Sequence, residues 1–185
     1  MTGLYDVAVS TFIAGLIILT IVALNGVISD AAFETTTSVA VQEDISDLAR
    51  IIEYDFYKIG YNSDPAFLYA DSEEVKFRSD IDRDGTADVI AYLLERPASE
   101  AVAYTQLFRS VNGSPRELIG TGIVEFKLQY FNALGTQLTG LSPTDSTTLA
   151  SIRSMKIQIK LQSVMSPDTV YGATYWEKYI SPKNL

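Results

Sequence analysis

The chain has 185 residues and a formal net charge of −9 at pH 7, and it contains neither Cys nor His. These absences exclude disulfides, thiolate chemistry and the usual zinc sites, and they remove the commonest general base. The acidic balance also argues against a nucleic-acid partner, because nucleic-acid binding requires a basic surface. The length fits one domain, or one domain with a membrane anchor.

An uncharged apolar segment covers the 23 residues 7–29, bracketed by Asp6 and Asp30. A helix of that length spans about 35 Å, enough to cross a hydrocarbon core of about 30 Å. The first basic residue of the chain is Arg50, whereas an ordinary secretory signal peptide has a basic segment before its apolar run. The pattern therefore predicts a transmembrane helix over 1–30, and a plain single-pass anchor is its simplest interpretation.

The helical pattern continues past Asp30 with a different character. Apolar residues recur at steps of three and four, which predicts an amphipathic continuation over 31–60 with one apolar stripe. Gly60 is a natural C-terminal stop. The two halves together predict one continuous helix of about 50 residues. Residues 35–39 read TTTSV, and their β-branched side chains lower helix propensity, so any bend or break is expected at this weak point. The stripe consists of Val41, Ile45, Leu48, Ile52, Phe56 and Ile59.

From residue 71 onward the apolar period changes to two, which is typical of half-buried antiparallel strands. Asn112-Gly113 predicts a hairpin turn, and a loop is expected over 135–148. One face of a strand should bury Val124, Phe126, Leu128 and Tyr130 together. The expected strands cover 75–79, 87–94, 124–130, 154–162 and 170–180.

The predicted fold class is α+β. A long N-terminal helix, apolar in its first half and amphipathic in its second half, packs on an antiparallel β-sheet. The sheet belongs to a β-rich globular domain over 61–185, which is long enough for a single core.

This pattern resembles the type IV pilin superfamily, and more narrowly the minor pilins and pseudopilins of the J and W types. Besides the half-apolar helix, two stretches carry the resemblance. Residues 51–62, IIEYDFYKIGYN, are similar to the end of the long helix in these subunits. Residues 77–94, FRSDIDRDGTADVIAYLL, are similar to their strand–acidic turn–strand unit. The resemblance covers most of the chain and implies a pilin-like fold.

The resemblance implies a non-enzymatic structural subunit of a type IV pilus-like or type II secretion pseudopilus-like filament. The helix would first sit in the inner membrane, with the globular domain on the extracytoplasmic side, and would later enter a periplasmic or cell-surface filament. The implied partners are other copies or other pilin-like subunits, bound by helix–helix packing, and no nucleic acid. The residues expected to carry assembly are Asp6, Phe12, Leu16, Leu19 and Leu24.

Asp6 has a particular place in this comparison. In the family, a leader peptide ends in Gly, and the mature chain carries a Glu at its fifth position that pairs with a neighbour's N-terminal amine. Cleavage after Gly3 would place Asp6 third, whereas removal of Met1 alone would place it fifth. An acid at the edge of a membrane segment is unfavourable unless it is paired, which favours a role in subunit register. The alternative is an interfacial residue or helix N-cap.

The sharpest chemical motif is DIDRDGTAD at residues 80–88. Acids occupy positions 1, 3, 5 and 9 of a calcium-binding loop, Gly85 occupies position 6, and the carbonyl of residue 86 would supply position 7. Ala91 stands at position 12 in place of the usual bidentate Glu. The pattern leaves two interpretations open, an ion-free, solvated Asp-Gly turn and a structural Ca²⁺ site. The candidate ligands are Asp80, Asp82, Asp84, Thr86 and Asp88.

Two other classes of function stay open. A single-pass membrane-anchored extracytoplasmic binding domain would use the same apolar helix without polymerising. A carboxylate–metal hydrolase would use the four acids of the loop, and it requires a cleft with an open coordination position. Aromatic residues near the end of the chain are expected mainly in sheet packing, with a sugar- or protein-contact surface as the alternative. They are Tyr171, Tyr175, Trp176 and Tyr179.

Overall fold

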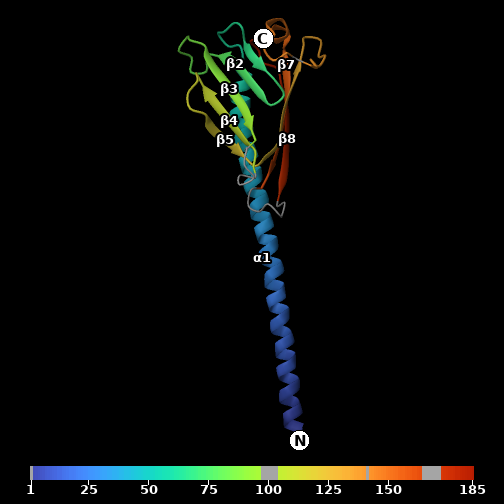
Figure 1. Ribbon diagram of the computed structural model, residues 1–185. Coiled ribbons are helices and arrows are strands. Elements are labelled where there is room, and N and C mark those ends of the chain that lie inside the picture. The colour runs from blue at the N-terminus through green and yellow to red at the C-terminus, as the bar shows by residue number, and fades with distance from the viewer. Residues whose placement is uncertain (1, 97–103, 141, 164–171) are drawn as a thin grey trace.

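A computed structural model describes residues 2–96, 104–140, 142–163 and 172–185. A single long helix, α1, carries two antiparallel sheets at one end, and its other end extends away from them (Figure 1). We call the protruding part, residues 3–36, the stalk, and the remainder the head. The elements are α1 (Thr2–Tyr57), β1 (Phe67–Ala70), β2 (Glu74–Ser79), β3 (Asp88–Glu95), β4 (Gln106–Val111), β5 (Glu117–Thr121), β6 (Ile123–Phe131), α2 (Ser146–Ser151), β7 (Ser154–Gln162) and β8 (Ala173–Ile180).

The helix α1 is continuous over 56 residues, which confirms the predicted continuous helix, and the weak point at 35–39 does not interrupt it. The hydroxyls of Thr35 and Thr36 each donate to the carbonyl four residues earlier, at 2.8 Å. Such bonds keep the side chains within the helix but slightly weaken it, so its support must come from elsewhere. Thr37 is buried against the head, so packing supports the helix from that point onward. Local propensity is a weak term, and these contacts outweigh it.

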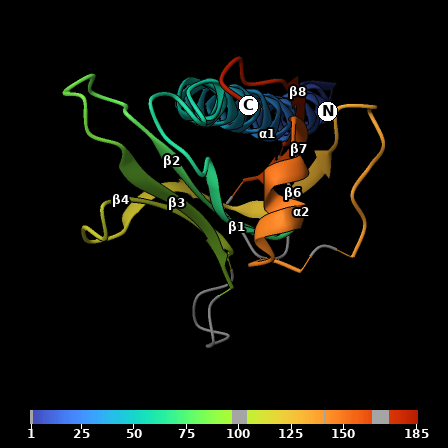
Figure 2. The same ribbon diagram turned by 90° about the horizontal axis from the view of Figure 1, so that it is seen from above.

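The strands form two sheets where a single one was expected. The first has the order β1-β2-β3-β4-β5 and the second the order β6-β7-β8, with every neighbouring pair antiparallel. Within each sheet, strands that follow one another in the chain therefore pair with each other. Seen from above, both sheets lie to one side of α1 (Figure 2).

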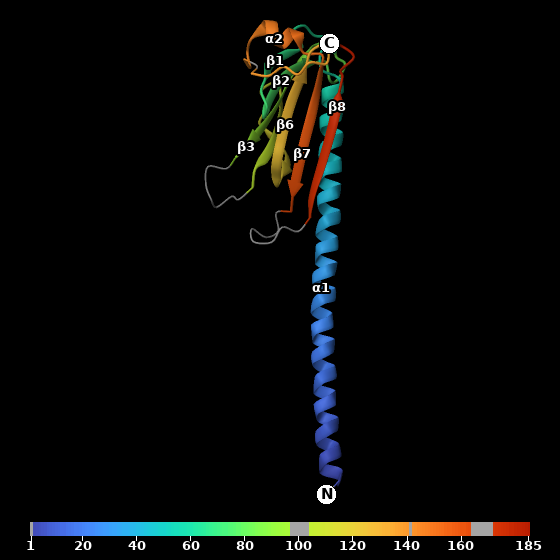
Figure 3. The ribbon, with the colours of Figure 1, turned by 90° about the vertical axis from the view of Figure 1, so that its right-hand side faces the viewer.

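The predicted apolar stripe of α1 is confirmed as the part of the helix that enters the core. All six of its residues are buried, and none is more than 6% exposed. The ring of Phe56 meets Phe77 of β2 and Tyr92 of β3 edge-on, with centroids 5.4 and 5.2 Å away. The second sheet meets α1 through β8, which runs alongside the helix (Figure 3), and Lys178 pairs there with Glu53 at 3.5 Å. The helix thus joins the two sheets into one core.

The helix α1 ends at Tyr57, three residues before the predicted stop, and the turns that follow contain Gly60. Its φ is +77°, a conformation that glycine adopts without strain. A Cβ added there would lie 2.8 Å from the carbonyl oxygen of Asn184, because the C-terminal segment crosses the helix end. The Gly60 N–H donates to the carbonyl of Arg78 at 2.9 Å, which ties the end of α1 to β2.

The strand predictions are confirmed in their positions over the described residues, with one error in facing, while residues 170–171 of the last predicted strand lie outside those residues. Val124 is 55% exposed, whereas Phe126, Leu128 and Tyr130 are buried as expected. The pairing of β6 with β7 shifts register between Ile123 and Glu125, and this irregularity turns Val124 outward. The expected loop 135–148 also contains the start of α2, which is capped by the carboxylate of Asp145.

Candidate functional site

The stalk is apolar on every side. Consecutive residues of an α-helix point about 100° apart, so the four consecutive residues 16–19 face all directions. Their side chains are between 49 and 67% exposed. Monomeric soluble proteins rarely expose contiguous apolar patches larger than a few hundred Å². A surface of this kind requires lipid or other helices around its whole circumference.

Three hydroxyl side chains in the apolar segment of the stalk are compatible with an apolar environment. The hydroxyl of Ser10 donates to the carbonyl of Asp6 at 2.7 Å, and that of Thr20 donates to Leu16 at 2.8 Å. Thr11 donates in the same way to Val7. These groups are satisfied inside the helix and need no water, which is the condition for crossing a bilayer.

The residues predicted to carry assembly all lie exposed on the stalk. Phe12 and Leu19 are 69 and 67% exposed, and Leu16 and Leu24 are about half exposed. Asp6 is exposed near the free end. Asp6 and Asp30 are separated by about 36 Å along the helix axis, so both would lie just outside a hydrocarbon core of about 30 Å if this segment spans a membrane.

The acidic loop joins β2 to β3 and brings three of the predicted ligands together. Carboxylate oxygens of Asp80, Asp82 and Asp84 lie within 4.8 Å of one another. Asp80 is 3% exposed, while the other two are exposed. Asp80 Oδ2 accepts from the N–H of Gly85 at 3.1 Å and from Asn62 Nδ2 at 3.3 Å.

The two remaining predicted ligands have other contacts. Asp88 accepts from Asn112 Nδ2 at 2.6 Å and from the Ile81 N–H at 3.3 Å, so both of its oxygens are hydrogen-bonded. It thereby fixes the acidic loop to the turn between β4 and β5. The N–H of Thr86 donates to Asp84 Oδ1 at 2.7 Å. The structure therefore groups three acids, with Asp88 to one side.

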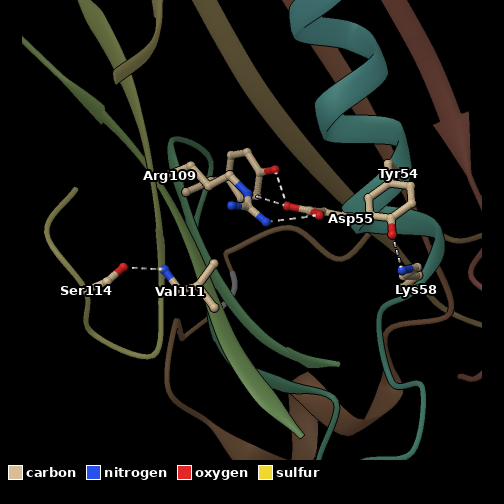
Figure 4. A network of polar contacts seen from close by, with 7 residues as sticks. Tyr54, Asp55, Lys58, Arg109, Val111 and Ser114 are labelled. Atoms are coloured by element: carbon tan, nitrogen blue, oxygen red, sulfur yellow. Dashed lines mark hydrogen bonds and ion pairs between the residues drawn. The ribbon is translucent and has the colours of Figure 1, made fainter. Parts of the chain in front are cut away.

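A buried polar network at the junction of α1 with the first sheet was not foreseen. Asp55 is 1% exposed and accepts from Tyr92 Oη at 2.6 Å and from Arg109 Nε at 2.7 Å. A second nitrogen of Arg109 lies 3.3 Å from the other carboxylate oxygen. Figure 4 shows Arg109 and Asp55 pointing toward each other, and it also shows Lys58 at the Tyr54 hydroxyl.

Burial and the adjacent Asp55 carboxylate raise the pKa of Tyr92 well above its usual value. Burial lowers the pKa of Arg109, but the hydrogen bond and the charge of Asp55 outweigh this effect, so the pKa lies above its usual value. Both groups therefore keep their protons and act only as donors to Asp55. One signal was available in the sequence, because Asp55 stands between Ile52 and Ile59 on the buried side of α1.

The aromatic residues of β8 lie on both sides of their sheet. Trp176 packs against the core, as sheet packing predicts. Tyr175 and Tyr179 are about half exposed, and Tyr179 shares a hydrogen bond of 2.7 Å with Ser154. Tyr171 lies outside the described residues.

Comparison with known proteins finds no matching family model and no matching curated protein. The α+β fold class of this protein therefore rests on its architecture alone. Within the described residues, one helix, Gly3–Tyr57, is long and apolar enough to cross a membrane. The same helix continues into an α+β head, where it packs on antiparallel sheets.

Proposed function

We propose that the chain is a non-enzymatic structural subunit of a pilus-like or pseudopilus-like filament, of the kind that the type IV pilin superfamily forms. The stalk holds the subunit in the inner membrane before assembly and enters the filament core afterwards. The head lies on the extracytoplasmic side throughout. The observation that carries the proposal is a stalk exposed on all sides that continues, without a joint, into the packed half of α1.

The proposal has a physical basis, because the stalk can exchange a lipid environment for a helix bundle. Lipid tails and apolar helices are equivalent neighbours for side chains such as Phe12 and Leu19, so transfer from a bilayer into a helix bundle leaves apolar burial nearly unchanged. Close packing of helices then supplies the contacts that hold subunits together. The head remains outside this bundle because its own core is already complete.

A membrane-anchored binding domain is the second candidate, and a cleft at the far end of the head favours it. The cleft has a volume of about 530 Å³, within the range of ligand sites. It is lined by Phe67, Leu149 and Ile152, with Asp64 and Arg153 among its polar residues. In this function the stalk is only an anchor, and the chain never polymerises.

The two functions differ in where the native chain is found. Cells that produce it are sheared, and the released material and the membranes are compared by immunoblot and by intact mass, including the mass of the N-terminal peptide. A resident single-pass membrane protein serves as the control for cell breakage. Chain in sheared, sedimentable material supports a filament subunit. Chain confined to membranes and extracted by detergent as a monomer contradicts it and favours the anchored domain.

Substitution of Asp6 by asparagine tests its predicted role in subunit register. We expect the Asp6→Asn chain to remain in membranes at its normal level, while its amount in sheared filaments falls about tenfold, the effect of losing about 1.4 kcal/mol per contact. Asp30→Asn is the matched control, because it removes the same charge at the other end of the apolar segment. Equal amounts of both variants in filaments would remove Asp6 from the assembly residues.

A further inference from the structure

We propose that the loop between β2 and β3 binds a structural Ca²⁺ through the carboxylates of Asp80, Asp82 and Asp84. The ion holds the loop to the end of α1 and so stabilises the head. This site is independent of the proposed filament function, because it lies wholly within the head of one subunit.

The first observation is an unsatisfied oxygen on a buried acid. Asp80 is 3% exposed, and its Oδ1 has no hydrogen-bond partner among the residues that the structure describes. A buried carboxylate is strongly unfavourable unless its oxygens are hydrogen-bonded, paired or bound to a metal. Since Oδ2 already accepts two hydrogen bonds, Oδ1 is the atom that requires a partner.

The second observation is uncompensated charge. Three carboxylates have oxygens within 4.8 Å of one another, and within the described ranges no Lys or Arg forms an ion pair with any of them. The nearby amine of Lys58 donates instead to the carbonyl of Ile81 at 2.8 Å and to the Tyr54 hydroxyl at 2.6 Å. Like charges at this separation repel, and a bound divalent cation reverses the sign of the interaction.

The chemistry of the donors favours calcium. All three are hard carboxylate oxygens at alternate positions of a short loop, and Ca²⁺ accepts six to eight such ligands in flexible geometry. Gly85 and Arg83 have φ of +92° and +66°, which curve the backbone around the acids. Backbone carbonyls and water would complete the shell, since Ala91 replaces the bidentate Glu. We therefore expect a dissociation constant of about 10⁻⁴–10⁻³ M, typical of extracellular calcium modules.

The loop is joined directly to the segment that follows α1. The N–H of Asp80 donates to the carbonyl of Tyr61 at 3.0 Å. Asn62 Nδ2 reaches both Asp80 Oδ2 and the carbonyl of Gly85, each at 3.3 Å. An ion at Asp80 therefore stabilises the contact between the helix end and the first sheet, and its effect is measurable as stability of the whole head.

The test uses the full chain in detergent micelles, first treated with EGTA. Thermal unfolding is followed by the fluorescence of Trp176, the only Trp in the chain. We expect Ca²⁺ at about ten times the dissociation constant to raise Tm by about 5 °C, and Mg²⁺ at the same concentration to raise it by less than half as much.

The variants separate binding from general charge effects. Asp82→Asn and Asp84→Asn should fold in EGTA with a Tm at or above that of the native chain, because one repulsive charge is gone. Each should show less than half of the native response to Ca²⁺, because asparagine keeps one oxygen ligand but loses the charge that attracts the cation. Asp44→Asn is the control, since it removes an exposed acid on α1 outside the loop, and it should keep the full response. An unchanged Tm of the native chain with Ca²⁺, an equal response in the loop variants, or an equal response to Mg²⁺ would overturn the proposal.

Discussion

Replacing Arg109 by methionine is expected to lower the free energy of unfolding of the head by about 3–5 kcal/mol. The substitution keeps a similar volume but removes the only ion-pair partner of Asp55 that the described part of the chain contains. The carboxylate is 1% exposed and would keep only the hydrogen bond from Tyr92. The effect is measured by urea unfolding of the full chain in detergent, with Trp176 fluorescence as the signal.

Two further variants identify the cause of this loss. Arg116→Met removes an arginine that is 55% exposed and pairs with Glu95 at 3.4 Å, and it should change stability by less than about 0.5 kcal/mol. The double variant Asp55→Leu/Arg109→Met removes both charges and should recover most of the loss, because no unpaired charge remains buried. A double variant as unstable as Arg109→Met would show that packing, and not the unpaired carboxylate, accounts for the effect.

Substitution of Phe56 by alanine is expected to destabilise the head by a similar amount, about 3–5 kcal/mol. The ring is fully buried and contacts Phe77 and Tyr92 edge-on, so its loss opens a cavity where α1 meets the first sheet. The same urea unfolding experiment measures the change.

The adjacent Tyr57 provides the matched control for Phe56. It lies on the same turn of α1 but is 44% exposed, so Tyr57→Ala removes an aromatic ring without opening a core cavity. Its expected change is less than about 1 kcal/mol. Similar losses in both variants would contradict the assignment of the stripe as the core-facing side of the helix.

The helix was predictable from sequence because its signals are local. An uncharged run and a repeat of three and four residues both depend only on neighbours along the chain, and the stripe from Val41 to Ile59 is buried as expected. The weak point at 35–39 shows the limit of local reasoning. Propensity there opposes the helix, but the burial of Thr37 against the head depends on the folded chain and is not visible in a local pattern.

Contacts between strands that are far apart in the sequence were harder to predict. The irregular pairing that turns Val124 outward depends on partners in β7 that are 35 and 38 residues away along the chain, so no local pattern predicts it. The partner of Asp55 is 54 residues away, on a strand whose residues are mostly half-buried, so alternation does not single out Arg109. Spacing correctly grouped Asp80, Asp82 and Asp84, but the bond from Asn112 to Asp88 crosses from another turn.

The uninterrupted helix makes the stalk and the head a single mechanical unit. Each residue added or removed within 31–36 would turn the head by about 100° about the helix axis and shift it by about 1.5 Å. A rotation of the apolar segment about the helix axis therefore turns the head by the same angle. A torque applied to one end of α1 is transmitted to the other end, because no hinge interrupts the helix. The number of residues in 31–36 therefore sets the angle between the contact surface of the stalk and the exposed surface of the head.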